Sequence, residues 1–508
     1  MPERFNAAEW LVDRHLESGD GERVAVVTGG EVTTYNGLGD RVGGAAAGLQ
    51  QLGVHAEQRV LIAAFDSLEF VATFLGAMRI GAIPLAANPL LPLPELAAIA
   101  DLSAARVAVL SPGRADELAS FDGGWPSTAQ VLRTDALAWP EKAATPAYPT
   151  WDESPGFWLC TSGTTGRPKL AMHRHIDLKV TATTYAHDIL HIDRGDRFYS
   201  VGPMFHAYGL GNSLTFPFSV AATTVLEPTR PPTPTLVANV VQREAPTLFF
   251  CIPTFYAALL ASDVPDDTFK SVRSAVSAAE PLPADLYARF LDRFGVEILD
   301  GIGSTELTHI FISNRRGALR PGTSGVPVDG YDIRLLDDEG TAVGADVPGH
   351  LYVGGESMAT GYWCNAEATR NAFHGPVMRT GDMYTRSGDG YFTYLGRSDD
   401  MLRVSGEWVS PAEVEAVLVE HEHVLEAAVV SGPDEDGIQR VVAHVVAVPE
   451  QALSPDELDA HCRTRLVGYK RPRRFVVHDT LPKTATGKIQ RFRLRDEDSR
   501  TGLPHATT

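Results

Sequence analysis

Short apolar segments alternate with helical patterns over the first 310 residues of this chain, and that alternation is the strongest constraint on its fold. Residues 60–63 and 107–110 are uninterrupted apolar runs of strand length. Between them, residues 71–78 place apolar side chains at i, i+3, i+4 and i+7, which is the spacing of one helix face. A similar pattern continues from about 170 to 310. Strands that alternate with helices predict a doubly wound α/β fold with a largely parallel sheet.

The chain is too long for one hydrophobic core, because a single core stops growing well below 508 residues. After about residue 310, short strands and glycine turns predict a small β subdomain. Beyond it, Ser410–Glu413 and Ser454–Glu457 each have the serine, proline and glutamate of a capping box. We therefore expect an N-terminal domain over residues 1–398, made of doubly wound α/β subdomains plus a small β subdomain, and a small α+β domain over residues 399–508.

Charge and composition narrow the class of partner. A net charge of −20 argues against a nucleic acid or an anionic membrane surface, since both attract a basic face. The most apolar region, residues 71–94, contains four prolines and is better explained by a buried helix and a loop than by a membrane span. No apolar stretch of a signal peptide follows residues 1–4. The four cysteines lie far apart, which fits a reducing compartment, so we expect a cytoplasmic protein.

A loop rich in glycine and hydroxyl groups follows the apolar run 157–160, which indicates a buried strand. Residues 161–169 read Thr-Ser-Gly-Thr-Thr-Gly-Arg-Pro-Lys. Glycines let the backbone approach a polyphosphate, hydroxyl and N–H groups donate to its oxygens, and Lys169 adds a positive charge. The segment is not a Walker A loop, since only two residues separate Gly163 from Gly166. From composition alone, a phosphate-binding loop and a polar hairpin turn both remain open.

Four later segments carry polar residues at turns, and each has an ordinary structural explanation by itself. They are Asp300–Glu306 after an apolar strand, Thr380–Asp382 before a β-rich run, the charged Gly396–Asp400, and Pro482–Lys488. The chain has no G-x-S-x-G, complete G-x-G-x-x-G or H-E-x-x-H motif for a competing chemistry. Taken in order with the glycine-hydroxyl loop, these segments resemble the motifs of the adenylate-forming acyl- and aryl-CoA synthetases.

The resemblance implies that ATP, Mg²⁺ and coenzyme A are bound along these motifs. Thr305 would contact the α-phosphate, and Glu306 would be the metal ligand, because Mg²⁺ prefers oxygen ligands beside the phosphates. Asp382 would accept hydrogen bonds from the ribose, and Arg397 would contact ribose or phosphate. Ile302 departs from the aromatic residue of many family members. The residues that the resemblance assigns to the nucleotide and to the pantetheine tunnel are Thr161, Ser162, Gly163, Thr164, Thr165, Gly166, Lys169, Ala279, Glu280, Pro281, Asp300, Gly301, Ile302, Asp382, Arg397, Ser405 and Gly406.

The resemblance also implies roles for two residues of the C-terminal domain, Lys488 and Asp399. Lys488 would catalyse adenylation by neutralising charge between the attacking carboxylate and the α-phosphate. Asp399 would be the hinge about which a mobile C-terminal domain rotates between two half-reactions. For both segments the ordinary alternative is a solvated charged surface.

The likeness is greatest to benzoate–CoA ligases, and it rests on residues 204–212 and 302–311. It implies a short, flat pocket suited to a ring, with apolar walls and two histidines as polar groups. His206 stands where benzoate ligases often carry an aromatic residue and halobenzoate ligases carry histidine. The alternative for each histidine is that it is a hydrogen-bonded residue of the core rather than a pocket residue. The expected pocket residues are His206, Ala207, Tyr208, Phe255, Ala278, Gly301, Gly303 and His309.

The resemblance therefore implies ATP-dependent activation of benzoate, or of a hydroxy- or amino-substituted benzoate, to acyl-AMP. Transfer to coenzyme A would then give the aryl-CoA, AMP and pyrophosphate. The alternative enzyme is a freestanding aryl-acid adenylating enzyme that loads the phosphopantetheine of a separate carrier protein. A degenerate nucleotide sensor is the non-enzymatic alternative. By analogy with relatives, a homodimer is a further expectation.

Overall fold

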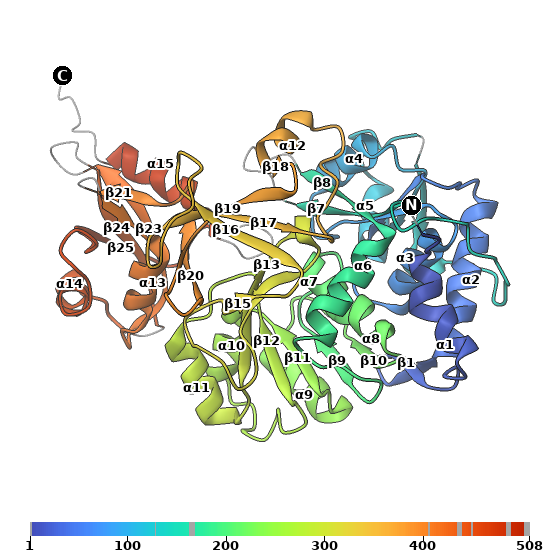
Figure 1. Ribbon diagram of the computed structural model, residues 1–508, viewed down its shortest axis with the longest axis horizontal. Coiled ribbons are helices and arrows are strands. Elements are labelled where there is room, and N and C mark those ends of the chain that lie inside the picture. Colours follow the sequence, from blue (N-terminus) through green and yellow to red (C-terminus); the bar gives the residue numbers. More distant parts are fainter. Residues whose placement is uncertain are drawn as a thin grey trace. The chain divides into compact units, whose positions relative to one another are not determined.

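The computed structural model describes residues 3–127, 129–161, 168–404, 407–433, 439–448, 451–483 and 489–501 (Figure 1). The chain divides into two compact units, residues 1–333 with 353–378, and residues 334–352 with 379–508. The domain boundary expected after residue 398 stays a prediction. Within the described ranges, every helix is too short or too polar to cross a membrane.

A six-stranded sheet forms the first half of the first unit. Its strand order is β6-β5-β3-β4-β7-β8, and all neighbours are parallel except β7 and β8. The expected strands at 60–63 and 107–110 are present, and so is the helix at 71–78. The elements are β3 (Arg59–Ala63), β4 (Ile83–Ala86), β5 (Val107–Leu110), β6 (Gln130–Arg133), β7 (Pro155–Thr161) and β8 (Lys169–Arg174), with α2 (Tyr35–Gln51), α3 (Leu68–Arg79), α4 (Leu93–Leu102) and α5 (Pro112–Leu118).

A nine-stranded sheet forms the second half of this unit, in the order β15-β14-β13-β12-β11-β9-β10-β1-β2. The six neighbouring strands from β13 to β1 are all parallel, whereas β2, β14 and β15 are antiparallel to their neighbours. Its strands are β1 (Val24–Thr28), β2 (Glu31–Thr34), β9 (Arg197–Ser200), β10 (Thr223–Leu226), β11 (Leu248–Cys251), β12 (Ser274–Ser277), β13 (Ile298–Gly303), β14 (Ile310–Ser313) and β15 (Val326–Pro327).

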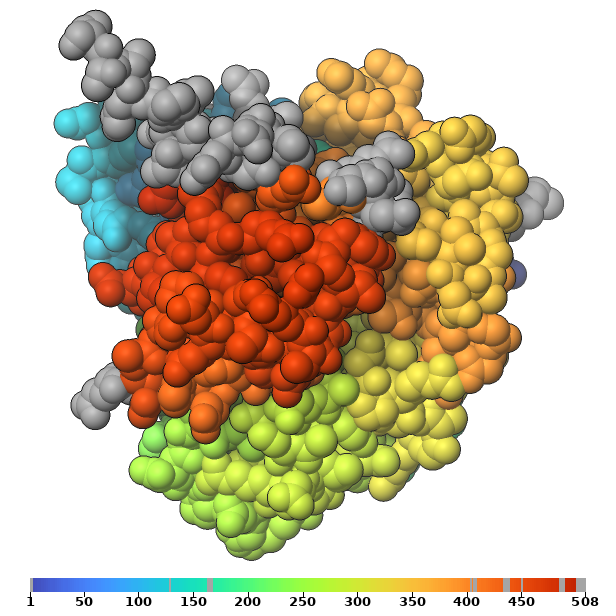
Figure 2. Space-filling model, turned by 90° about the vertical axis from the view of Figure 1, so that its left-hand side faces the viewer, coloured from blue at the N-terminus to red at the C-terminus, as the bar shows by residue number. Residues whose placement is uncertain are grey.

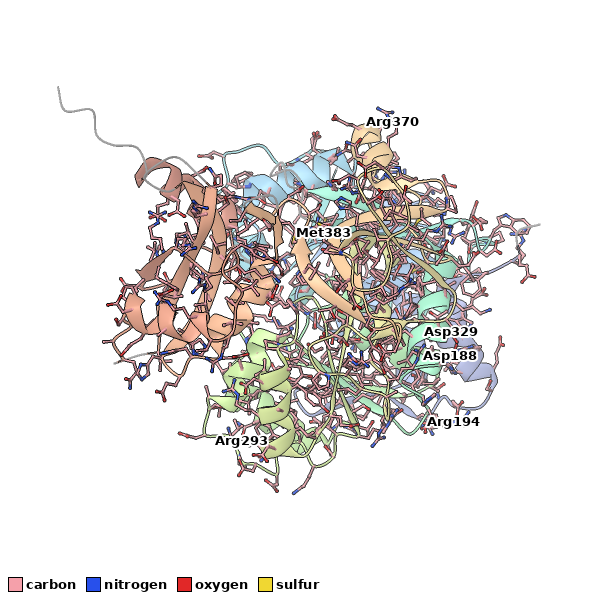
Figure 3. All side chains as sticks on the ribbon, turned by 60° about the vertical axis from the view of Figure 1, so that its left-hand side comes forward. Asp188, Arg194, Arg293, Asp329, Arg370 and Met383 are labelled. Carbon is pink, nitrogen blue, oxygen red and sulfur yellow. The ribbon has the colours of Figure 1, made fainter. Side chains whose placement is uncertain are left out.

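Helices follow the strands, as the alternating pattern predicts. Arg293, in the last turn of α11 (Ala284–Phe294), fixes the chain after α10 (Figure 3), because its guanidinium donates to the carbonyl oxygens of Leu260, Ser262 and Val264 at 2.6–3.0 Å. The remaining helices of this unit are α1 (Arg14–Glu17), α6 (His175–Thr181), α7 (Ala207–Leu210), α8 (Phe216–Ser219), α9 (Pro234–Glu244), α10 (Pro253–Leu260) and α12 (Ala366–Ala372).

The short strands expected after residue 310 are also present. β16 (Tyr331–Leu336), β17 (Gly349–Gly355) and β19 (Val377–Arg386) each run along the chain from one unit into the other. β18 (Phe373–His374) pairs with the first residues of β19, and β20 (Phe392–Arg397) pairs with its later residues.

The second unit contains a hairpin and a three-stranded sheet with helices. Its core includes Val414, Leu418, Val429 and Ala443, all fully buried. Figure 2 shows the surface of the described residues between 402 and 501 in orange and red. The elements are β21 (Leu402–Val404), β22 (Glu407–Val409), α13 (Pro411–Val419), β23 (Val424–Pro433), β24 (Gln439–Ala447), α14 (Pro455–Arg463), β25 (Arg474–His478) and α15 (Arg491–Thr501). The strand order is β23-β24-β25.

The two expected capping boxes are only partly present. The hydroxyl of Ser410 accepts from the backbone N–H of Glu413, but the Glu413 carboxylate binds Lys470 at 2.7 Å. Ser454 precedes α14 and makes no side-chain cap hydrogen bond, so the prediction of a cap there is wrong. The motif therefore predicted correctly where both helices begin, but not all of the hydrogen bonds of the two caps.

A buried carboxylate ties together the amino ends of three parallel strands. Asp196 precedes β9, and it accepts from Arg273 Nε (2.9 Å) and Nη2 (2.7 Å) before β12 and from Thr247 Oγ1 (2.7 Å) before β11. Burial alone would raise the pKa of Asp196, but the bonds from Arg273, Thr247 and the N–H of Asp193 outweigh it and hold the pKa below its ordinary value. The charged form of Asp196 is therefore the stabilising one.

We predict that Asp196→Asn lowers the free energy of unfolding by about 2–3 kcal/mol, because charged hydrogen bonds are lost in a buried place. The check is the thermal unfolding midpoint, with Asp267→Asn as the matched control at an exposed ion pair. Since the folded pKa is depressed, the difference should be complete above pH 3.8 and shrink as the pH falls below it. An equal midpoint for both variants at pH 7 would contradict the role of Asp196.

Candidate active site

The glycine-hydroxyl loop is held at both ends by the antiparallel pair β7 and β8. Thr161 is the last residue of β7 and is paired with Lys169, the first residue of β8. The buried strand expected at 157–160 is confirmed. The loop residues between these ends, Ser162, Gly163, Thr164, Thr165 and Gly166, lie outside the described residues.

A carboxylate, a phenol and an ammonium group meet at the start of β8. Glu306 is buried, and its Oε1 accepts a hydrogen bond of 2.7 Å from the hydroxyl of Tyr362. The Lys169 Nζ lies 5.0 Å from the centroid of the same tyrosine ring, which is a cation–π distance. The structure thus brings together the predicted lysine and the predicted metal ligand, and it adds a tyrosine that sequence analysis missed.

The Thr305–Leu307 turn is a short 3₁₀ helix, η5, that follows β13. The hydroxyl of Ser304 accepts from the N–H of Leu307 and closes the turn. The backbone oxygen of Thr305 accepts from His173 Nε2 at 2.9 Å. Fixing this turn sets the direction in which the Thr305 and Glu306 side chains leave the backbone.

His173 and Asp177 are buried polar residues beneath that turn. The Nδ1 atom of His173 lies 3.2 Å from Asp177 Oδ2 and 3.1 Å from Thr308 Oγ1. Asp177 also accepts from the N–H and the guanidinium of Arg174 at 2.9–3.1 Å. Sequence analysis missed this network, although a histidine in a strand four residues before an aspartate was a signal for it.

The first four residues of the motif that begins at Asp300 belong to a strand, and the turn begins only after them. β13 runs from Ile298 to Gly303, so it is longer than the strand expected from the apolar run. Ser277, the last residue of β12, is paired with Asp300, which places the carboxyl ends of two parallel strands together. Burial raises the pKa of Asp300 well above its ordinary value, against nearby donors that include the Ser277 hydroxyl.

The segment after β12 carries the other residues expected at the nucleotide. Ala278 is buried, and Ala279 is exposed with a left-handed φ of +73°. Glu280 accepts from the hydroxyl and the N–H of Thr254 at 2.6 and 3.1 Å. Pro281 is exposed. An exposed turn at the carboxyl edge of a parallel sheet is a common place for a ligand.

His309 is the centre of a group of rings. Its ring centroid lies 4.5 Å from Phe216, 5.1 Å from Tyr185 and 5.5 Å from Tyr208. Its Nε2 is 3.1 Å from the Oδ1 of Asn212, and burial lowers the pKa of His309 to about 3. The imidazole is therefore neutral near pH 7, and it acts as a hydrogen-bonding group rather than a cation.

The chain closes tightly around His309. A Cβ on Gly211 would lie 2.4 Å from His309 Cδ2, and a Cβ on Gly303 would lie 2.5 Å from the His309 backbone oxygen. A Cβ on Gly301 would meet Ile312 O at 2.8 Å across β14. These glycines are needed for close packing, whatever else they contact.

The other expected pocket residues lie on neighbouring elements. The Tyr208 hydroxyl donates to the backbone oxygens of Val276 (3.0 Å) and Cys251 (3.3 Å), so this ring is held as a wall. His206 precedes α7 and its ring lies 4.7 Å from that of Phe205, while Ala207 is buried. Phe255 is half-buried and packs against the core of the nine-stranded sheet.

The second unit holds the expected ribose residue. Asp382 Oδ1 accepts from Arg397 Nη1 at 3.1 Å, and the same nitrogen donates to Thr380 O at 2.9 Å. Asp399 is exposed and its backbone oxygen accepts from Arg495 at 3.1 Å. Ser405, Gly406 and Lys488 lie outside the described residues, so the roles predicted for them rest on the sequence alone.

The chemistry of the donor set fits magnesium bound as a nucleotide complex. Within the described ranges no cluster of three or more His, Cys, Asp or Glu could hold a metal alone. Mg²⁺ commonly takes one or two protein carboxylates and completes its octahedron with phosphate oxygens and water. Glu306 is a buried carboxylate that contacts the same tyrosine as Lys169, and it meets that lower requirement.

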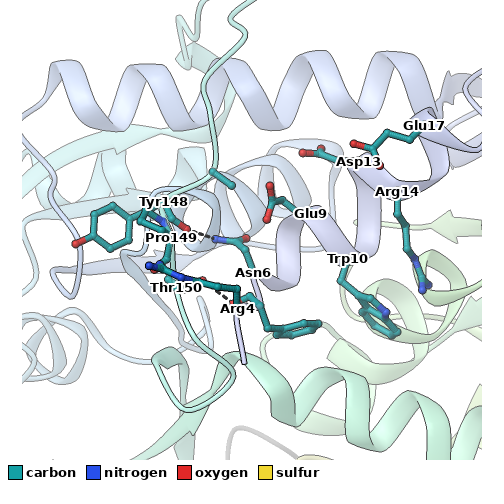
Figure 4. Close-up of a pocket in the computed structure, with 12 residues that line it drawn as sticks. Arg4, Asn6, Glu9, Trp10, Asp13, Arg14, Glu17, Tyr148, Pro149 and Thr150 are labelled. Atoms are coloured by element: carbon teal, nitrogen blue, oxygen red, sulfur yellow. Dashed lines mark hydrogen bonds between the residues drawn. The ribbon is translucent and has the colours of Figure 1, made fainter. Parts of the chain in front are cut away.

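A cavity of about 520 Å³ lies away from these residues, between the N-terminal segment and residues 147–150 (Figure 4). Arg14 covers the ring of Trp10 at 4.3 Å there. None of the predicted site residues lines this cavity.

Comparison with known proteins agrees with the fold and the motifs. The benzoate–CoA ligase of Thauera aromatica is 44% identical over 97% of this chain and 96% of its own length. The 4-hydroxybenzoate–CoA/benzoate–CoA ligase of Rhodopseudomonas palustris (strain ATCC BAA-98 / CGA009) is 38% identical over 98% of this chain and 95% of its own. The crystal structure of the anthranilate CoA ligase AuaEII in complex with anthranoyl-AMP has a TM-score of 0.93, with 36% identity over 99% of this chain and 98% of that one.

The expected α/β fold class is thereby confirmed. The profile of the AMP-binding enzyme family matches residues 13–363, and that of the AMP-binding enzyme C-terminal domain matches residues 413–488. With a family match over more than half its length, this chain belongs to the AMP-binding enzymes.

Proposed function

We propose that this protein activates an aromatic carboxylic acid with ATP and transfers the acyl group to coenzyme A. The observation that carries the proposal is 44% identity to a benzoate–CoA ligase over 97% of the chain. Relatives named as CoA ligases of benzoate and hydroxybenzoate confirm the prediction of an AMP-forming aryl-CoA ligase. They do not favour the alternative of a carrier-protein loading enzyme.

In the first half-reaction the carboxylate oxygen attacks the α-phosphorus of ATP, and the bond to pyrophosphate breaks. Lys169 and the glycine-hydroxyl loop would hold the phosphates, and Thr305 would contact the α-phosphate. Mg²⁺, with Glu306 as its protein ligand, would supply positive charge to the phosphates. Lys488 would stabilise the charge that builds up between carboxylate and phosphate, and the Asp382–Arg397 pair supports a role at the ribose.

In the second half-reaction the CoA thiol attacks the acyl carbon and AMP leaves. Mixed anhydride formation makes this step favourable, because AMP is a far better leaving group than the carboxylate oxygen. Ser405 and Gly406 would line the path of the pantetheine, with Asp399 as the hinge between the half-reactions. These roles rest on the motifs.

The group of rings around His309 supports an aromatic acid as the substrate. Tyr208 and Phe216 supply apolar faces, and the neutral imidazole and the Asn212 amide supply hydrogen bonds without charge. A hydroxyl or amino group on the ring can pair with such groups, whereas a second carboxylate would be buried without a cation.

We predict that benzoate and its hydroxy and amino derivatives are turned over at least about tenfold faster, as kcat/KM, than cinnamates, which are two carbons longer, or short fatty acids, which lack the ring. One extra or missing methylene in an apolar pocket is already worth about 1–3 kcal/mol. The measurement is pyrophosphate release across these acids with coenzyme A present. A fatty acid as the best substrate would contradict the aryl assignment. Repeating the screen with a holo carrier protein in place of coenzyme A tests the acceptor.

We also predict that Lys488→Ala lowers the rate of adenylate formation by about 10²-fold or more, because it removes charge stabilisation from the transition state. Thioester formation from synthetic benzoyl-adenylate should stay close to the wild-type rate. Single-turnover kinetics of the two half-reactions provide the check.

The matched control is Lys483→Ala, in the same terminal motif, where the ammonium is paired with Glu426 at 2.6 Å. It should leave both half-reactions near wild type. If Lys488→Ala slowed both half-reactions equally, its assignment to adenylation would be wrong.

A further inference from the structure

Tyr362 stands between the two oppositely charged residues of the candidate active site. Its hydroxyl donates to Glu306 Oε1 at 2.7 Å, and the Lys169 Nζ lies 5.0 Å from the centroid of its ring. The tyrosine is only 5% exposed. One side chain therefore contacts both the predicted metal ligand and the predicted phosphate-binding lysine.

The backbone around Tyr362 is fixed to the strand that carries Lys169. Residues 360–363 run antiparallel beside β8, with hydrogen bonds from Met172 N to Gly361 O (3.0 Å), Thr360 N to Met172 O (2.9 Å) and Trp363 N to Leu170 O (2.9 Å). Ala171 of β8 is paired with Tyr362. The distance between the tyrosine ring and Lys169 is therefore set by strand pairing.

The segment that carries Tyr362 is also fixed to the turn that carries Glu306. The N–H of Ala359 donates to the backbone oxygen of Glu306 at 2.8 Å, which joins the segment before Tyr362 to the Thr305–Leu307 turn. The hydroxyl of Thr369 accepts from the N–H of Tyr362 at 3.0 Å. The phenol thus has little freedom to leave the carboxylate.

In the part of the chain that the structure describes, Lys169 and Glu306 form no ion pair with each other. Each charge contacts the same neutral phenol instead, the carboxylate at the hydroxyl and the ammonium at the ring face. A direct Lys–Glu pair would satisfy both charges before the nucleotide arrives, and breaking it would cost binding energy. A phenol keeps the carboxylate hydrogen-bonded and oriented, and leaves its charge for the metal–nucleotide complex.

We propose that Tyr362 is a positioning residue for adenylation, which holds Glu306 and Lys169 apart and oriented for the Mg²⁺–ATP complex. The inference rests on the proposed function, since it assigns the tyrosine to the first half-reaction. It predicts a defect that is confined to steps in which Mg²⁺–ATP is used.

The test compares Tyr362→Phe with the wild type in benzoate-dependent ATP–pyrophosphate exchange. Phenylalanine keeps the ring under Lys169 and removes the bond to Glu306. Because a hydrogen bond to a charged group is lost, we expect the KM for Mg²⁺–ATP and the half-saturating Mg²⁺ concentration to rise about tenfold or more. The KM for benzoate should change little, and thioester formation from synthetic benzoyl-adenylate should keep its rate.

The matched control is Tyr35→Phe, because the Tyr35 hydroxyl is also buried and donates to Ala222 O at 2.8 Å, a contact that does not involve the Thr305–Leu307 turn. It should leave the KM for Mg²⁺–ATP unchanged. A second comparison places Tyr362→Phe in a Glu306→Gln background. If the tyrosine acts through the carboxylate, it should add less than about threefold to the effect of Glu306→Gln there.

Each outcome bears on one claim. Absence of benzoate-dependent exchange in the wild type would overturn the proposed function, and the inference with it. Exchange in the wild type that Tyr362→Phe leaves unchanged would overturn the inference alone. So would equal losses in both half-reactions, or full additivity with Glu306→Gln, since these indicate a general structural role.

Discussion

The metal-binding role that we propose for Glu306 requires a carboxylate that stays charged while it is almost buried, and this requirement would account for the arrangement around it. Burial of a charge is costly unless hydrogen bonds replace water. Here the compensation comes from a neutral donor, the hydroxyl of Tyr362 at 2.7 Å. A neutral donor stabilises the carboxylate without cancelling its charge, whereas a cation in the same place would lower its attraction for Mg²⁺. The donor is in place because residues 360–363 pair with β8 in a register that sets Tyr362 opposite Ala171.

The overall charge of the chain makes such local placement necessary. A net charge of −20 repels a nucleotide on average, so binding depends on donors at the site itself. Lys169 is the first residue of β8, at the end of the glycine-hydroxyl loop, and among the described residues its ammonium contacts a ring and forms no ion pair. Arg397, in the second unit, is already bound to Asp382 and Thr380 O. Within the part of the chain that the structure describes, the two cations therefore differ, since Lys169 forms no ion pair and Arg397 is partly neutralised by Asp382.

Sequence alone predicted the fold class well, because strand and helix periodicities in this chain are local properties. The apolar run 107–110 and the periodic residues 71–78 became β5 and α3 within a few residues. Details that depend on neighbours were less predictable. The predicted cap at Ser454 is absent. β13 continues through the glycines of its motif because β14 pairs with it.

The candidate site shows the same division. Glu306 and Lys169 were found because each belongs to a contiguous motif. Tyr362, His173 and Asp177 were missed, since their contacts join segments that are far apart in the chain, such as the bond from His173 to Thr305 O. Periodicity carries no information on such pairs. Only the register of β8 against its neighbours brings them together.

The surroundings of His309 indicate how a ring pocket can be selective without charge. A Cβ on Gly211 would lie 2.4 Å from the His309 ring, and a Cβ on Gly303 would lie 2.5 Å from the His309 backbone oxygen, so both glycines let the chain approach this residue closely. The ring is thus fixed by backbone packing, and Asn212 fixes its hydrogen bonding. Burial also keeps it neutral. Because neither the position nor the charge of this imidazole can adjust, the proposed pocket would distinguish substituted benzoates by shape and by hydrogen bonds. The charge of the substrate carboxylate would then be the task of the residues proposed to hold the phosphates.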